Sequence, residues 1–338
     1  MIRGERLKKK LLGIGMLCCL LVTGCFGKGN KDITNTLIQK IEKAKSYHVT
    51  GKLEIINNED SYQYDVEVSY KEEDYFRVSL KNQTNNHEQI ILRNKEGVYV
   101  LTPSLNKSFK FQSDWPYNNS QSYLLQILVK DIQNDKSKTV EQKNNGYIIS
   151  TSVNYANNKN LKKQKIYVDK KGTIQKVEVL NAEDIVRMRM TFEKIDMGAT
   201  FDKDYFELSQ NMKTTEAIEE TSKTIDDVIY PMYMPANTYL ESQDIVEKEN
   251  GERIILTFGG DSPFMLVEET VTVEDDITII PVYGEPELLL DTIGSITENS
   301  ANWISNGIEY YAVSDTLSGE ELLQVVQSIS VIPVMNMK

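Results

Sequence analysis

The sequence contains very little histidine and cysteine, the side chains on which most metal sites and many catalytic sites depend. Its 338 residues include two histidines, His48 and His87, and three cysteines, Cys18, Cys19 and Cys25. A zinc site needs three or four clustered ligands, and a serine or cysteine nucleophile needs a neighbouring base. Neither histidine has such a setting, because His48 alternates onto the polar face of a predicted strand and His87 follows an asparagine-rich loop. We therefore expect no metal, no cofactor and no enzymatic activity.

Acidic residues are abundant, and they leave two further kinds of site to consider. Among 50 acidic residues, a pair of carboxylates acting as the acid and base of a glycosidase stays open, although no pair stands out by its spacing. The run Glu274-Asp275-Asp276 suggests calcium, but it lacks the regular spacing and the central glycine of a calcium-binding loop. A solvated turn is the interpretation that we prefer for this run.

Basic residues are outnumbered and unevenly distributed. The net charge of −12 argues against nucleic-acid binding, because phosphates require a concentrated basic surface. Residues 225–338 contain 21 acidic and only three basic residues, whereas residues 26–224 are close to neutral. Such asymmetry indicates two domains, and the polar stretch 209–224 between them is predicted to be a linker. We expect a first domain over residues 32–208 and an acidic second domain over residues 225–338, which unfold separately.

Long hydrophobic runs are also missing. The apolar run 11–22 is shorter than the roughly 20 residues that cross a bilayer as a helix. It follows a basic stretch and precedes Val22-Thr23-Gly24-Cys25, so it has the pattern of a secretory signal and resembles the lipobox of bacterial lipoproteins. The resemblance implies a signal peptide over residues 1–24, lipidation of Cys25, a flexible tether over residues 25–31 and lipid anchoring to a membrane outside the cytoplasm. The alternative is an uncleaved anchor that ends at Cys25.

The first domain is predicted to be an antiparallel sheet with a few helices. Asp32 is a candidate N-cap of a helix whose apolar face includes Leu37 and Ile41. Apolar residues then alternate with polar ones over 47–55 and again over 62–70, which predicts a hairpin. Further strands are predicted at 75–80, 89–94, 98–102, 107–112, 147–153, 163–169, 174–180 and 186–195, and one helix at 120–133. Consecutive hairpins favour a sheet wrapped over the helices.

The second domain is predicted to be a small α+β unit. Residues 228–235 are expected to be extended, because a proline disfavours helix in the residue before it. The sequence Ser318-Gly319-Glu320-Glu321 is typical of a capping box, and we assign the apolar stripe of the helix after it to a core with Trp303 and Tyr310. Strands are predicted at 252–258, 264–273, 277–283 and 308–313.

The strand pattern of residues 32–208 resembles the LolA/LolB-like lipoprotein-carrier fold, a curved half-barrel capped by helices. Within it, residues 94–111 followed by Trp115-Pro116-Tyr117 look like the GerS-related germination and sporulation lipoproteins of spore-forming Firmicutes. The resemblance implies a non-catalytic protein of the cell envelope or a forespore membrane. It also implies a protein partner, for which a peptidoglycan amidase of the spore cortex is one candidate.

Two functions are consistent with these features. One is the binding of a protein partner, with Trp115 and Tyr117 as candidate contact residues, because aromatic side chains on a loop provide interface anchors. The alternative for Trp115 is that it packs under the predicted helix as a lid on the half-barrel. The other is a carrier or sensor that holds a lipid or a lipoprotein in the concave face of the half-barrel. A carrier needs an open apolar cavity there, whereas a scaffold fills the same space with its own side chains.

Overall fold

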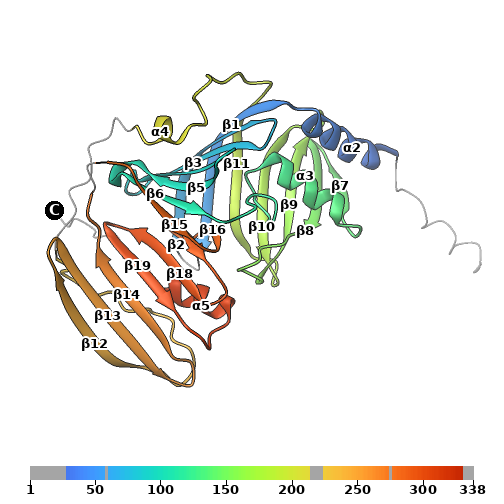
Figure 1. The fold of residues 1–338 in the computed structure, drawn as a ribbon. Coiled ribbons are helices and arrows are strands. Elements are labelled where there is room, and N and C mark those ends of the chain that lie inside the picture. Colours follow the sequence, from blue (N-terminus) through green and yellow to red (C-terminus); the bar gives the residue numbers. More distant parts are fainter. Residues whose placement is uncertain (1–27, 58–59, 214–223, 274–275, 330–338) are drawn as a thin grey trace, which may run out of the picture.

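The chain folds into two β-sheets with short helices on their faces (Figure 1). The computed structural model describes residues 28–57, 60–213, 224–273 and 276–329, and for residues 28–32 it describes the backbone alone. The first sheet has the order β15-β6-β5-β4-β3-β2-β1-β11-β10-β9-β8-β7. Its strands are β1 (Ser46–Asn57), β2 (Asp60–Lys71), β3 (Tyr75–Asn82), β4 (Glu88–Asn94), β5 (Gly97–Thr102), β6 (Lys107–Phe111), β7 (Thr139–Lys143), β8 (Gly146–Ser152), β9 (Leu161–Asp169), β10 (Ile174–Asn181), β11 (Val186–Met197) and β15 (Thr278–Val282); a short 3-10 helix, η1 (Pro103–Leu105), joins β5 to β6.

The hairpin predicted at the start of the first domain is confirmed. Strands β1 and β2 pair without a break from Ser46 opposite Lys71 to Asn57 opposite Asp60. The alternating apolar residues of both strands lie buried on one face, which is the inner face of the curved sheet. This curved, largely antiparallel sheet with helices agrees with the predicted class of fold, and we call it the half-barrel.

The sheet bends where β1 meets β11. The register of the two strands shifts between Thr50 and Gly51. A Cβ atom on Gly51 would lie 2.2 Å from the backbone oxygen of Thr191, so only glycine lets the two backbones approach this closely. Because such an irregularity increases the local twist, the glycine inside an otherwise alternating strand marks a point at which the sheet curves.

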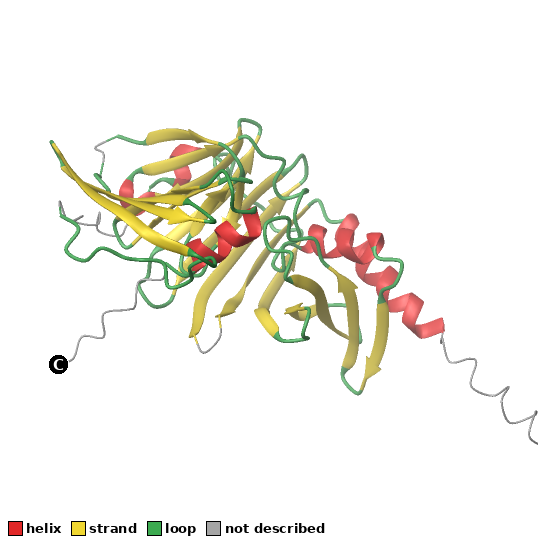
Figure 2. Ribbon diagram, turned by 90° about the horizontal axis from the view of Figure 1, so that it is seen from below, coloured by secondary structure: helices red, strands yellow, loops and turns green. Residues whose placement is uncertain are grey.

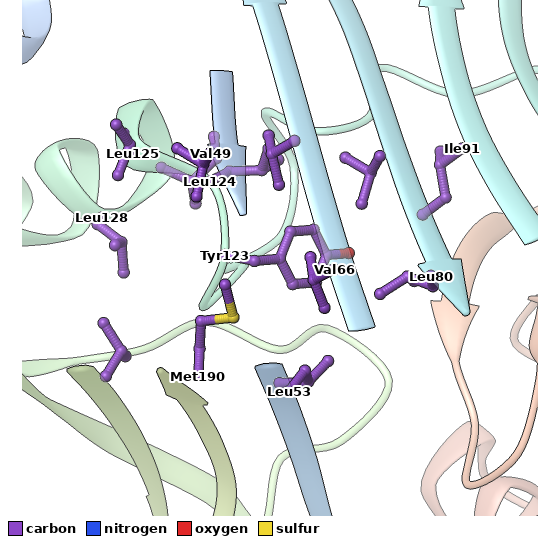
Figure 3. Close-up of a cluster of buried hydrophobic side chains, with 14 of the residues drawn as sticks. Val49, Leu53, Val66, Leu80, Ile91, Tyr123, Leu124, Leu125, Leu128 and Met190 are labelled. Atoms are coloured by element: carbon purple, nitrogen blue, oxygen red, sulfur yellow. The ribbon is translucent and has the colours of Figure 1, made fainter. Parts of the chain in front are cut away.

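Helices α2 (Lys28–Glu42) and α3 (Leu125–Asn134) contact each other beside the end of the sheet that β7 closes (Figure 2). Apolar side chains of α3 and of the turn before it meet the inner face of the strands, where Leu124 and Leu128 lie near Val49 and Met190 (Figure 3). The predicted apolar face of α2 is confirmed, because Leu37 and its neighbours in the pattern are buried.

Both helices begin elsewhere than predicted. Helix α2 begins at Lys28, so Asp32 lies inside the helix instead of capping it, and residues 28–31 of the predicted tether are helical. Helix α3 begins at Leu125 and not at Ser120. The reason is that the Ser120 amide donates to the Asn154 carbonyl oxygen at 2.8 Å, and the Asn154 amide donates to Ser120 Oγ at 2.8 Å. These two bonds hold the chain before α3 in a turn.

The outer face of β3, β4 and β5 is covered by residues 201–212, which include helix α4 (Leu208–Asn211). Phe206 and Met212 are buried against this face, and Arg77 Nε donates to Asn211 Oδ1 at 2.6 Å. The predicted linker at 209–224 is therefore wrong at its start, because α4 packs on the sheet. Most of the rest of that stretch, residues 214–223, lies outside the described residues.

The second sheet has the order β12-β13-β14-β19-β18-β17-β16. One of its faces is covered by α5 (Gly319–Gln327), which begins with the predicted capping box of Ser318 and Glu321. Beneath α5 the rings of Trp303 and Tyr310 stack with centroids 5.0 Å apart, so their assignment to the core is confirmed. The strands are β12 (Thr238–Lys248), β13 (Gly251–Gly260), β14 (Phe264–Thr270), β16 (Glu285–Leu288), β17 (Ile293–Ile296), β18 (Ser300–Ser305) and β19 (Ile308–Val313).

Buried Glu268 of β14 holds the extended stretch that was predicted before the second sheet. Its side chain is fully buried, and it accepts a hydrogen bond from the Ile229 amide at 3.0 Å. Burial raises the pKa of this carboxyl to about 7. The stretch 228–235 is therefore attached to the sheet by a buried acid that the sequence pattern did not single out.

The second half of the chain supplies one strand to the first sheet. Strand β15 pairs in parallel with β6, from Thr278 opposite Lys107 to Val282 opposite Phe111. The strand predicted at 277–283 is present, but it belongs to the half-barrel and not to the acidic domain. Parallel pairing requires a long connection between the two strands, and here residues 112–277, about half of the chain, provide it.

The segment after β15 enters the inner face of the half-barrel, and we call residues 285–293 the inserted segment. Leu290 and Ile293 are buried in the same hydrophobic cluster as the inner face of the first sheet. Gln89 of β4 accepts a hydrogen bond from the Ile293 amide at 2.7 Å, and Tyr64 Oη donates to the Leu290 carbonyl oxygen at 2.9 Å. The inserted segment therefore joins the second sheet to the core of the half-barrel, while the face of the second sheet beneath α5 has a core cluster of its own.

These buried contacts between the two sheets predict that the protein unfolds as one unit, contrary to the expectation of two separate halves. Cleavage at a protease site placed within residues 214–223 should leave the fragments associated, with one cooperative thermal transition and one peak in size-exclusion chromatography. Gln89→Leu in the cleaved protein removes the acceptor of the buried Ile293 amide, which should destabilise the fragment complex by about 1–3 kcal/mol. Fragments that separate without denaturant, or two independent transitions, would contradict the prediction.

Candidate functional site

A cleft of about 230 Å³ lies where the half-barrel meets the inserted segment and α5. One wall comes from the ends of β1, β9 and β11, and the other comes from β16 and α5. The lining residues are Ile55, Ile56, Asn57, Asn158, Asn160, Leu161, Arg187, Met188, Glu287, Leu288, Leu290, Glu320, Leu323, Gln324 and Gln327. The cleft thus depends on both halves of the chain, and neither half forms it alone.

Of the fifteen residues that line the cleft, five carry side-chain amides, three carry charges and seven are apolar. Asn57, Asn158 and Asn160 face it from the half-barrel, and Gln324 and Gln327 face it from α5. An amide both donates and accepts hydrogen bonds, so this lining suits polar groups with both kinds of atom. It does not suit an acyl chain, which leaves such groups unpaired.

At the base of the cleft lies the carboxyl group of Glu287, a residue of β16 that is 6% exposed. Asn119 Nδ2 donates to its Oε2 atom at 3.3 Å, and Asn157 Nδ2 donates to the same atom at 3.5 Å. Burial raises the pKa of Glu287 to about 7, and these two hydrogen bonds oppose the rise. The inserted segment therefore brings an acid into the half-barrel that is half-protonated near neutral pH.

A second acid, the half-buried Asp131 of α3, lies on the same side of the sheet. Gln164 Nε2 donates to Asp131 Oδ2 at 2.9 Å, and burial raises the pKa of this carboxyl to about 6. Burial and the charges of Asp131 and Glu287 also raise the pKa of Tyr155. Neither acid was predicted as a site residue, because neither lies in a motif and residues distant in the sequence shield both from water.

Trp115, one of the two predicted partner contacts, belongs to the core. It is 1% exposed, and it ends a row of aromatic rings that runs from Tyr47 through Tyr70 to Phe76. The Trp115 ring meets Phe76 edge-on with centroids 6.0 Å apart. The interpretation of Trp115 as an exposed loop residue is therefore wrong, because strand pairing places this aromatic row directly beneath it.

Tyr117, the other predicted contact, is half-buried at the rim of the same row. Its hydroxyl donates to Asp74 Oδ1 at 2.5 Å, and the guanidinium of Arg93 lies 5.5 Å from its ring centroid. Burial, followed by the bond to Asp74, raises the pKa of the phenol. Because its polar groups are already paired within the chain, its role as a partner contact stays a prediction.

Cys25, the predicted lipidation site, lies outside the described residues, as do Glu274 and Asp275. His48, predicted to lie on the polar face of its strand, has a partner within the chain: its Nδ1 lies 3.0 Å from Ser69 Oγ, which in turn lies 2.9 Å from the Tyr205 hydroxyl. In the parts of the chain that the structure describes, no three histidine, cysteine or acidic side chains come together as a metal site. No helix in those parts has the length and apolar content needed to cross a membrane.

Comparison with known proteins identifies the family. Residues 8–206 match the model of the sporulation protein YdcC-like family. Sporulation protein YdcC of Bacillus subtilis (strain 168) is 36% identical over 323 residues, which cover 94% of this chain and 96% of that protein. The chain therefore belongs to the YdcC-like family of sporulation proteins, which agrees with the predicted resemblance to a sporulation family.

Solved structures overlap with the chain only weakly. The complex of MucA and MucB from Pseudomonas aeruginosa gives a TM-score of 0.32 at 12% identity and covers 88% of this chain and 97% of the matched chain. The complex of the CwlD amidase from Clostridioides difficile with the GerS lipoprotein gives a TM-score of 0.23 at 15% identity and covers 54% of this chain and 100% of the matched chain. The family assignment rests on the sequence matches alone.

The buried position of Glu287 predicts a pH-dependent stability. Its pKa is about 7 in the folded protein against 4.5 for the free side chain, so the folded state binds the extra proton and stability falls as the pH rises through this window. Glu287→Gln cannot ionise, and its free energy of unfolding relative to the wild type should rise from pH 4.5 to about pH 8, by at most about 3 kcal/mol.

Urea unfolding of both proteins across this pH range measures the difference. The matched control is Glu298→Gln, which removes an exposed carboxyl group from the turn between β17 and β18. Parallel pH profiles for the wild type and Glu287→Gln would show that the carboxyl at the base of the cleft is not held in its neutral form.

Proposed function

We propose that the protein is a non-catalytic scaffold, anchored by a lipid outside the cytoplasm, that binds a protein partner during sporulation. The observation that supports this proposal is the filled inner face of the half-barrel. In a carrier, that face would hold the cargo. Here the chain's own side chains occupy it.

The filling comes from two directions. From one side, Tyr123, Leu124 and Leu128 pack against the inner faces of β1, β2 and β11 (Figure 3). From the other side, Leu290 and Ile293 of the inserted segment join the same cluster. The cleft that remains, at about 230 Å³, is below the roughly 300–1,000 Å³ of ordinary ligand pockets and has an amide-rich lining.

The lipid anchor is proposed from the sequence. Several acyl chains on Cys25 would bind a membrane far more strongly than a single chain, which gives only marginal attachment. The family match begins at residue 8 and so includes the stretch that ends at Cys25. The resemblance of residues 94–117 to germination lipoproteins makes a cortex peptidoglycan amidase the first partner to test.

One experiment tests whether the half-barrel holds a lipid. The protein comprising residues 26–338 is mixed with vesicles of the host's membrane lipids and then purified again. Native mass spectrometry should then give the mass of the bare chain, because the inner face has no space for an acyl chain. A stoichiometric lipid adduct that survives purification would favour a carrier and overturn the scaffold proposal.

The anchor predicts that Cys25→Ser moves the protein from the membrane fraction to the soluble fraction and abolishes labelling with a palmitate analogue. Cys18→Ser and Cys19→Ser are the matched controls, because these cysteines lie inside the apolar run that is expected to be removed. Both controls should stay labelled and bound to the membrane. Equal labelling of Cys25→Ser would exclude Cys25 as the lipidation site.

A further inference from the structure

Strand β12 forms a long, free edge of the second sheet (Figure 1). It spans eleven residues, and nearly all of its side chains are exposed. Tyr239 and Ile245 are each 59% exposed, and Leu240 and Val246 are more than two-fifths exposed. From Ser242 to Lys248 its register with β13 is unbroken, so the other side of this stretch presents a regular row of backbone donors and acceptors.

The other three sheet edges are protected in ways that β12 is not. Proteins blunt free edges with proline or by keeping the edge strand short. Strand β15 contains Pro281, β16 contains Pro286, and β7 has five residues. Strand β12 contains no proline and is at least twice as long as each of the others. Among the edges that the structure describes, β12 therefore offers the best template for an additional strand.

The charge of β12 limits what can pair with it. The strand carries Glu241, Asp244 and Glu247, and its one basic residue, Lys248, stands at its end. Two copies of β12 side by side would bring these acids together, and like charges on paired strands are destabilising. The surrounding domain, with 21 acidic and three basic residues over 225–338, adds to this repulsion and favours a basic partner.

We propose that the free edge of β12 binds an extended, basic segment of a partner protein as an eighth strand of the second sheet. This inference rests on the proposed scaffold function and names the contact. Backbone hydrogen bonds supply affinity in such strand addition, and alternate side chains supply specificity. Apolar residues of the segment would cover Leu240 and Ile245 on one face of the edge, while its basic residues lie on the other face, which carries Asp244.

The probe is a synthetic peptide of alternating lysine and valine, added to the full-length Cys25→Ser protein. Hydrogen exchange should slow at the amides of Ser242–Lys248 and stay unchanged at β7 and β15. A peptide of the same sequence and charge, N-methylated at alternate residues, cannot extend the ladder and should bind at least about tenfold more weakly. Equal binding of both peptides, protection at another edge or no binding of the unmethylated peptide would overturn the proposal.

Charge-reversal variants test whether the acidic residues of β12 contribute to peptide binding. Asp244→Lys with Glu247→Lys should weaken binding at least about tenfold, since it puts a positive charge on the face of the edge that the peptide's lysines occupy and reverses the negative charge on the other face. The matched control is Glu298→Lys with Asp315→Lys, which changes the net charge equally. Asp315 follows β19, three strands and about 14 Å from β12, beyond the screening length of about 8 Å at physiological salt, so binding should stay within about twofold. Equal losses of peptide affinity in both double variants would show that the peptide is attracted by the net charge and does not pair with β12, which would overturn the proposal.

Two further outcomes separate this inference from the scaffold function. A protein crosslinked to the chain in sporulating cells, but with its contacts away from β12, would overturn the inference and leave the scaffold function standing. Sedimentation experiments that show a homodimer with its contacts at β12 would also overturn it, because the acidic residues of two β12 strands should repel each other.

Discussion

The hydrogen bond from the Ile293 amide to buried Gln89 fixes how the two sheets are joined. The two residues are 204 positions apart, and Gln89 also accepts from the Thr292 hydroxyl at 3.0 Å. With this contact in place, the inserted segment fills the inner face, Glu287 lies at the base of the cleft and α5 forms one of its walls. A buried amide without an acceptor destabilises the fold. A shift of the inserted segment would break this hydrogen bond and would also displace Glu287 and the cleft.

Local patterns predicted local structure well, and they failed where the partner was distant in the sequence. Alternation located β1 and β2, and the Ser318–Glu321 pair located the start of α5, because each signal lies within its own element. Strand β12 was not predicted, since an edge exposed on both faces shows no alternation of apolar and polar residues. Strands β7, β16, β17 and β18 were missed as well, because they are short and have weak patterns of their own.

The candidate site was harder to predict than the fold. Trp115 was a candidate contact residue because it lies on the loop after a predicted strand, yet the aromatic row that buries it comes from three different strands. Glu287 and Asp131 carry no motif, and only tertiary packing removes them from water. The same packing buries Glu268, so the acidic composition of the second half overstates the charge that this half presents to a partner.

The parallel pairing of β15 with β6 sets an order of events during synthesis. The chain emerges from its N-terminus, so β6 is complete long before β15, about 170 residues later, is available to cover it. During that interval β6 is the open margin of an unfinished sheet, and such margins promote misassociation. Contacts of this sequence separation also slow folding. Prompt delivery of the C-terminal third of the chain therefore protects its first half from aggregation.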